Sequence, residues 1–138
     1  MAHRQTISSG SPWEDLVGYS RATRIGSFIE VSGTVAADAS GSIVGADEPY
    51  TQTRYALEKA ISAVRDAGAE RDDIIRTRVY ITDFAHYQEV ARAHRELFGD
   101  LKPASTMVQV AALVKPEFLV EVELSAIMRR PPAEAQFA

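Results

Sequence analysis

Two glutamates near the C-terminal end of the chain have the clearest potential for chemistry. Glu121 and Glu123 stand two residues apart in the mostly apolar run 118–124. Residues two apart on a strand point to the same face, and an unpaired carboxylate is costly to bury. Both side chains are therefore expected to face a polar cavity, another subunit or an exposed sheet face. Glu121 could hold a water molecule for general-base chemistry, or it could pair with an arginine across a subunit interface.

Composition excludes several other chemistries. The 138 residues contain no cysteine, which rules out disulfides, thiolate nucleophiles and cysteine-based metal sites. His86 and His94 are eight apart, whereas helical metal pairs usually sit four apart, so we expect no metal and no cofactor. The net charge of −4 argues against nucleic acid as a partner. No apolar run approaches about 18 residues, so no membrane span is expected and a cytoplasmic setting is predicted.

The remaining pattern predicts a single α+β domain over residues 1–138, with a frayed tail at 129–138. Apolar periodicity and turn residues predict, in chain order, a strand over 26–33, a helix from Pro49 to the stop at Gly68, a strand over 74–81, a helix capped by Thr82-Asp83 and ended by Gly99, and a closing pair of strands at 102–113 and 118–124. Helices separated by single strands imply crossovers. We expect a two-layer αβ sandwich, with two helices on one face of a mixed sheet.

The other face of that sheet is expected to be covered. On the last strand, Val120, Val122 and Leu124 form a row that suits the helices. The opposite row, which contains Leu119, Glu121, Glu123 and Ser125, is half apolar. A half-apolar face usually packs against something, and this chain is too short for a third layer. The pattern therefore predicts a homo-oligomer.

Three segments resemble the Rid or YjgF-type family, whose members are often labelled L-PSP. They are Gly18-Tyr19-Ser20-Arg21 with Ile29-Glu30-Val31-Ser32-Gly33, then Arg76-Thr77-Arg78-Val79-Tyr80-Ile81-Thr82-Asp83, and then Lys102-Pro103-Ala104 through Glu121-Val122-Glu123. The last segment resembles the C-terminal signature of the family, and the resemblance covers nearly the whole chain.

The resemblance implies a chorismate-mutase-like homotrimer with clefts between subunits. Better-known members hydrolyse enamines and imines to a ketone or keto acid and ammonia. It implies that Glu121 positions or activates water and that Tyr19 and Gly33 line the cleft. It also places substrate-binding residues at Ala104, Ser105 and Thr106. Tyr19 could equally be a packing residue with a bonded hydroxyl, and Gly33 could meet a backbone requirement.

Ser105 is the main departure from the family pattern. In the better-known members an arginine follows the Pro-Ala pair and clamps the substrate carboxylate, and a guanidinium suits that task. Loss of such a charge-assisted contact removes about 1.5–3 kcal/mol of binding. The chain therefore resembles an arginine-lacking branch. Substrates other than simple imino acids are expected, unless Arg21, Arg78 or an arginine of another subunit supplies the charge. The hydroxyls of Ser105 and Thr106 would suit a neutral or hydroxylated ligand.

Three functions follow as hypotheses. The first is an imine or enamine hydrolase in an inter-subunit cleft, with a small molecule and a second copy of the chain as partners. The second is a non-catalytic ligand-binding or chaperone-like trimer, which the missing arginine favours. The third is an endoribonuclease, a name sometimes attached to the family, which the acidic net charge disfavours.

Overall fold

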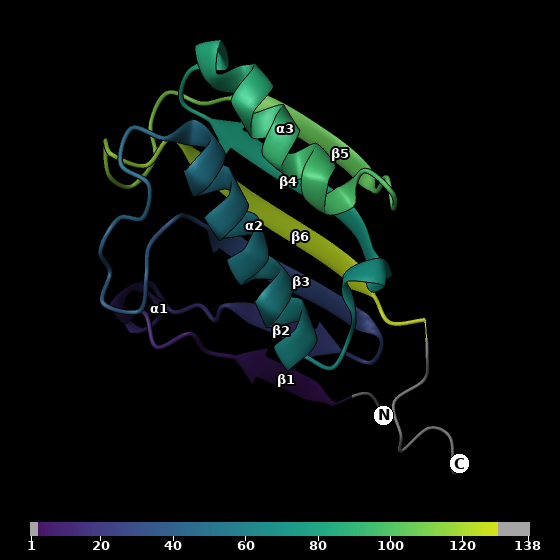
Figure 1. The fold of residues 1–138 in the computed structure, drawn as a ribbon. Helices are drawn as coiled ribbons and strands as arrows, with labels where there is room; N and C mark the ends of the chain where they lie inside the picture. Colours follow the sequence, from purple (N-terminus) through teal and green to yellow (C-terminus); the bar gives the residue numbers. More distant parts are fainter. Residues whose placement is uncertain (1–2, 130–138) are drawn as a thin grey trace.

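A six-stranded sheet with its two long helices on one face forms the molecule (Figure 1). The computed structural model describes residues 3–129. Along the chain the elements are β1 (Arg4–Ile7), α1 (Pro12–Val17), β2 (Ala22–Ile25), β3 (Phe28–Thr34), α2 (Pro49–Asp66), a 3₁₀ turn (Arg71–Asp73), β4 (Ile74–Ile81), a second 3₁₀ turn (Phe84–His86), α3 (Tyr87–Phe98), β5 (Ala104–Gln109) and β6 (Val120–Ile127). The predicted tail lies mostly outside the described residues. Among the described residues, no helix combines the length and apolar character that a membrane crossing requires.

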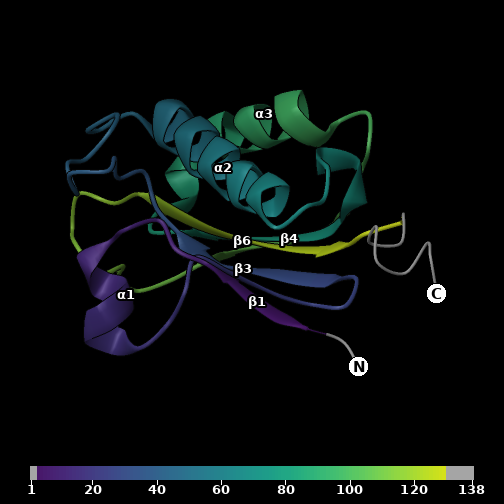
Figure 2. The same cartoon turned by 90° about the horizontal axis from the view of Figure 1, so that it is seen from below.

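The sheet order is β1-β2-β3-β6-β4-β5, and the layering agrees with the expected two-layer sandwich (Figure 2). β4 and β5 are parallel, because the crossover through α3 returns the chain in the same direction. The other neighbouring strands are antiparallel. β6 inserts between β3 and β4, so the two C-terminal strands expected as a pair are not hydrogen-bonded neighbours. β5 becomes the outer edge instead.

Strand alternation places the core as the sequence predicts. Val120, Val122 and Leu124 are fully buried on the side that carries the helices. The apolar stripe of α2 packs on them through Leu57, Ala60 and Val64, which are also fully buried. On α3, Val90, Ala93 and Phe98 form the buried side, whereas Tyr87 at the start of the helix is 51% exposed. β1, α1 and β2 were not predicted, since each is short and none carries a periodic apolar pattern.

A buried glutamine of α2 holds the loop that leads into β6. Gln52 is fully buried. Its Nε2 donates to the carbonyl oxygens of Gly45 and Glu117, at 3.2 and 2.9 Å. Its Oε1 accepts from the backbone N–H of Leu119 at 2.9 Å. One side chain therefore satisfies three backbone groups on two loops, and it sets where β6 begins.

Replacement of Gln52 is expected to destabilise the fold strongly. Gln52→Leu keeps the volume but leaves buried backbone groups without partners, and each such group costs about 1–3 kcal/mol. We expect a loss of about 3 kcal/mol in the free energy of unfolding, measured by urea denaturation. Gln88→Leu, on the exposed side of α3, is the matched control and should change stability by less than about 0.5 kcal/mol. Equal losses in the two variants would contradict this role.

Candidate functional site

Glu121 lies on the open face of the sheet, which is the face opposite α2 and α3 (Figure 2). Its carboxylate rests against the backbone of Gly33 on β3, where a Cβ at residue 33 would overlap Oε2 and approach Cδ to 3.0 Å. Gly33 is therefore required for this close approach. Burial raises the pKa of Glu121, the nearby Glu123 raises it further, and Arg21 partly offsets both. Within residues 3–129, no side chain donates a hydrogen bond to Glu121 and no cation forms an ion pair with it.

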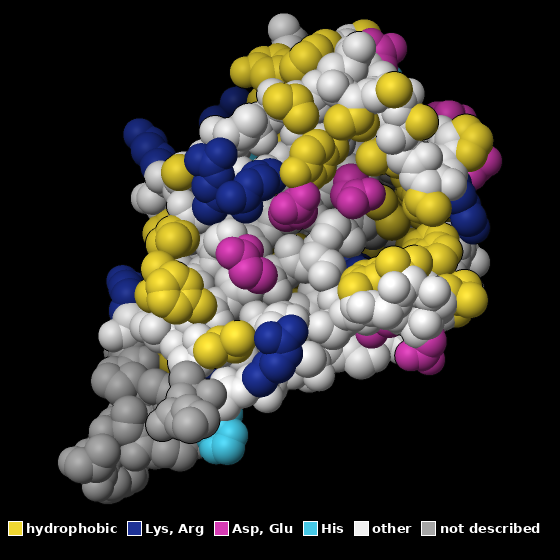
Figure 3. Space-filling view, turned by 180° about the vertical axis from the view of Figure 1, so that it is seen from behind, with side chains coloured by type: hydrophobic (Ala, Val, Ile, Leu, Met, Phe, Trp, Pro, Cys, Tyr) yellow, Lys and Arg dark blue, Asp and Glu magenta, His cyan; other side chains and the backbone are white. Residues whose placement is uncertain are grey.

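The open face is charged around Glu121 and hydrophobic towards its rim (Figure 3). Arg78 stands opposite Glu123, and Tyr80 stands opposite Glu121, in the pairing of β4 with β6. The neighbouring Glu123 carboxylate, and then burial, raise the pKa of the Tyr80 phenol. Ser125 donates to Glu30 at 2.6 Å. Figure 3 shows acidic side chains near the middle of this face, with basic side chains beside them and hydrophobic ones towards the rim. Such a face suits a polar ligand.

The predicted substrate-binding residues of β5 lie apart from Gly33. β4 and β6 separate β5 from β3, so three inter-strand spacings, or about 14 Å, lie between them. Ser105 accepts from Thr77 at 2.7 Å on the helix side, whereas Thr106 accepts from Arg76 at 2.7 Å on the open face. The two hydroxyls therefore point to opposite sides, because side chains alternate along a strand. They do not form the ligand-binding pair that their adjacency suggested.

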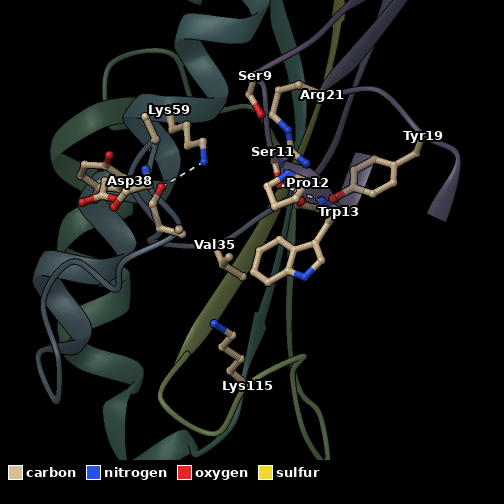
Figure 4. A pocket seen from close by; sticks show the side chains of 16 residues that line it. Ser9, Ser11, Pro12, Trp13, Tyr19, Arg21, Val35, Asp38, Lys59 and Lys115 are labelled. Carbon is tan, nitrogen blue, oxygen red and sulfur yellow. Dashed lines mark hydrogen bonds between the residues drawn. The ribbon is translucent and has the colours of Figure 1, made fainter. Parts of the chain in front are cut away.

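Tyr19 and Gly33 line a cavity of about 460 Å³ at one end of the sheet (Figure 4). Tyr19 follows Gly18, which ends α1 in the left-handed region at φ 90°. Arg21 connects the two residues: its guanidinium lies 5.6 Å from the Tyr19 ring centre, and Nη1 donates to Gly33 O at 2.9 Å. Trp13 lines the same cavity and packs edge-on against Phe118, with 6.4 Å between ring centres.

Gly33 is the point where these features meet. Its Cα faces the Glu121 carboxylate, and its carbonyl oxygen is held by Arg21. Within one chain, Gly33 therefore contacts Glu121 and is linked through Arg21 to Tyr19, whereas Ala104, Ser105 and Thr106 lie apart from it. Sequence reasoning named Arg21 only as a substitute cation, and it missed Lys59, which reaches the cavity from α2. No local motif distinguishes Lys59 from the other polar residues of that helix.

His94 of α3 has a partner on the neighbouring strand β4. His94 Nε2 lies 2.8 Å from Thr77 Oγ1, and burial lowers the pKa of His94. Over residues 3–129, no cluster of three or more His, Asp or Glu side chains is arranged to hold a metal ion.

The raised pKa of Glu121 predicts a pH-dependent stability difference. Below the ordinary carboxyl value of 4.5, the glutamate is protonated in both states and its burial carries no charge penalty. As pH rises through the folded-state pKa, the unfolded chain has already ionised, so the wild type loses stability. Glu121→Gln lacks this penalty. We expect the free energy of unfolding, measured by urea denaturation, to be equal in variant and wild type near about pH 4 and to be larger in the variant near about pH 8.

Glu89→Gln, on an exposed position of α3, is the control and should show no such divergence. Equal stability of wild type and Glu121→Gln at the higher pH would indicate that a cation of a neighbouring copy pairs with Glu121.

The mixed sheet with two long helices on one face is the chorismate-mutase-like fold of the YjgF proteins. Residues 12–128 match the sequence model of the family described as Endoribonuclease L-PSP, and the chain belongs to this family. A curated relative, the uncharacterized protein SCO2049 of Streptomyces coelicolor, is 36% identical over 120 residues, which are 87% of this chain and 89% of that protein.

Solved structures agree with this assignment. Rv2704 of Mycobacterium tuberculosis, a member of the YjgF/YER057c/UK114 family, is 41% identical with a TM-score of 0.83, over 91% of this chain and 100% of that one. The YjgF gene product of E. coli is 26% identical with a TM-score of 0.79, over 91% and 99%.

Proposed function

We propose that the protein hydrolyses the C=N bond of a small imine, or of the enamine in equilibrium with it, to a carbonyl compound and ammonia. The observation that carries this proposal is the isolated, half-buried Glu121 carboxylate with its raised pKa. A carboxylate whose pKa is shifted towards neutrality is suited to accept and return a proton near physiological pH. Tyr80 and Glu123 supply polar neighbours, and Gly33 gives the carboxylate the space that it occupies.

The reaction needs one water and no external oxidant. In the proposal the substrate reacts as its protonated imine. Glu121 takes a proton from water while the oxygen adds to the imine carbon, and the C=N π electrons move to the nitrogen, which becomes a neutral amine. Glu121 then returns the proton to this amine, the C–N bond breaks, ammonia leaves, and the hydroxyl proton is released to Glu121 as the carbonyl forms. Tyr19 shapes the wall of the substrate cleft, and backbone N–H groups near Gly33 and at Ala104, Ser105 and Thr106 bind the polar group of the substrate.

A second copy of the chain completes this cleft in the proposal. The residues 104–106 cannot reach Gly33 of their own subunit, because two strands intervene. β5 is an edge strand, and large hydrophobic side chains remain exposed on the open face, including Ile25, Phe28 and Val108. Burial of this face between copies would cover these side chains. The trimer of the family resemblance is the assembly proposed.

An ammonia-release assay tests the function directly. An amino-acid or amine oxidase generates the imine in place, and hydrolysis is followed as the rate of ammonia formation above the spontaneous rate. We expect acceleration with imines of neutral or hydroxylated substrates, and weaker acceleration with imino acids, because Ser105 replaces the arginine clamp. No acceleration with any imine, together with saturable binding of the carbonyl products, would favour the non-catalytic binding function instead.

A further inference from the structure

A line of three polar side chains crosses from α3 over β4 to the edge strand β5. His94 Nε2 lies 2.8 Å from Thr77 Oγ1, and Thr77 Oγ1 lies 2.7 Å from Ser105 Oγ. Thr77 and Ser105 stand directly opposite each other in the parallel pairing of β4 with β5. We call these three side chains the hydroxyl relay, because each is hydrogen-bonded to the next.

The direction of the hydroxyl relay is set by Thr77. Its side chain is fully buried, and its hydroxyl donates to Ser105 Oγ. A hydroxyl has a single proton, so the contact between Thr77 and His94 needs a proton from the imidazole. Nε2 of His94 therefore carries a hydrogen and donates it to Thr77 Oγ1.

The His94 ring is held in the position that this bond requires. It packs on the buried ring of Phe98, with 5.0 Å between the ring centres. Burial lowers the pKa of His94, so the imidazole is neutral near physiological pH and carries one N–H. The bond to Thr77 places that hydrogen on Nε2 and leaves Nδ1 bare.

Ser105 is the exposed end of the relay. Its oxygen accepts from Thr77, and none of the described residues 3–129 accepts its own proton. Hydrogen bonds in a line polarise one another, so the outward proton of Ser105 is a stronger donor than that of an isolated serine. A neutral donor of this kind suits a neutral carbonyl oxygen, whereas a carboxylate is bound better by a guanidinium.

We propose that His94 is a positioning residue, which acts through Thr77 to turn the proton of Ser105 outward, so that Ser105 donates to a carbonyl oxygen of the substrate. The inference rests on the proposed hydrolase function, in which β5 of one copy borders the cleft of the next. It narrows the substrate class to imines that carry a neutral carbonyl group, such as the imine of an amino ester or an amino amide. Thr106 takes no part, because it accepts from Arg76 on the other face of β5.

Nitrogen-15 NMR of the full-length, histidine-labelled protein tests the direction of the relay. The chain has three histidines, and the signals of His94 are those that disappear in His94→Gln. Long-range proton–nitrogen spectra distinguish the two tautomers of a neutral imidazole. We expect a protonated Nε2 and a bare Nδ1 at about pH 7.5. A bare Nε2 would overturn the inference, because Thr77 would then donate to His94 and accept the proton of Ser105.

Two substitutions of His94 separate positioning from packing. His94→Gln keeps an N–H group near the position of Nε2, whereas His94→Phe keeps a ring against Phe98 but has no donor. In His94→Phe the buried Thr77 oxygen lacks a donor, and the proton of Ser105 turns inward to supply one. We expect His94→Phe to bind methyl pyruvate, a product-like probe, about three- to tenfold more weakly than wild type, and His94→Gln to stay within about twofold, in NMR titrations.

Two further titrations connect this effect to Ser105 and to the ester group of the probe. Ser105→Ala should weaken the binding of methyl pyruvate by the same factor, and addition of His94→Phe to it should cost nothing more. The ketone 2-pentanone, which lacks the ester, should bind equally to wild type and to all these variants. Melting temperatures show whether His94→Phe is folded, and the tautomer measurement tests the inference independently of that variant.

Equal affinity of His94→Phe and His94→Gln for methyl pyruvate would overturn the role of His94, and so would additive losses in the double variant. Failure of methyl pyruvate to bind wild type would overturn the substrate class. If methyl pyruvate binds with the expected dependence on His94 but wild type releases no ammonia from any imine, only the proposed hydrolase fails. If ammonia release depends on Glu121 while both His94 variants bind the probe equally, only the role of His94 fails.

Discussion

Glu121→Gln is expected to lower imine turnover by about 10²–10⁴-fold while the protein remains folded and assembled. The amide has nearly the shape of the carboxylate, so the close contact with Gly33 is retained. It cannot accept the proton of the attacking water, which is the step assigned to Glu121. Measurement of kcat for ammonia release, with light scattering for the assembly state, checks both parts. Unchanged turnover would remove Glu121 from the reaction.

Glu123→Gln is the matched control on the same face and the same strand. We expect it to keep turnover within about tenfold of wild type, because Glu123 interacts with Tyr80 and is not assigned the water. Its charge raises the pKa of Glu121, so its removal should lower that pKa. The acid limb of the pH–rate profile should therefore move to lower pH. A loss as large as that of Glu121→Gln would show that the two carboxylates act as a unit.

Gly33→Ala is expected to reduce turnover by about 10²-fold with little loss of stability. The added Cβ would overlap the Glu121 Oε2, so the carboxylate must move away from its position. The obstructed group is the end of a flexible side chain, and we expect a stability cost of about 1 kcal/mol. A displacement of about 1 Å at a catalytic group is enough for a loss of this size.

A double-mutant cycle identifies the cause of the Gly33→Ala effect. In a Glu121→Ala background the clash is absent, so addition of Gly33→Ala should cost almost no stability and no further turnover. Stability comes from urea denaturation and turnover from ammonia release. If Gly33→Ala lowered stability equally in both backgrounds, the requirement for glycine would come from the backbone and not from Glu121.

Local pattern was sufficient for the main elements. The strand predicted over 74–81 is β4 to the residue, and the helix predicted from Pro49 to the stop at Gly68 is α2. Both segments have a clear apolar periodicity and turn residues at their ends, and they are long enough for the pattern to repeat several times. The alternation along 118–124 also placed Val120, Val122 and Leu124 in the core. β1, α1 and β2 escaped prediction because four to six residues offer too little pattern.

The sequence did not reveal which strands are neighbours in the sheet or which distant side chains meet. Adjacent strands in the chain suggested a C-terminal pair, yet β6 lies between β3 and β4. The adjacent hydroxyls of Ser105 and Thr106 suggested one binding surface, yet the pleat of β5 sends them to opposite faces. The sequence gives Gln52 no special role, although its side chain bonds to the loop before α2 and to the loop before β6.

From the order of its residues alone, this chain determined its family, its two helices, its core rows and the placement of Glu121 on the face opposite the core. Those features depend on side-chain period and on neighbours along the chain, which are visible in one dimension. Tertiary structure alone decided that Glu121 rests on Gly33 and that Arg21 and Lys59 share a cavity. It also decided that two strands separate residues 104–106 from the strand of Gly33. Such contacts join segments tens of residues apart. The pairing of β3 with β6 brings Glu121 to Gly33, and the packing of α2 on the sheet brings Lys59 to the cavity of Arg21.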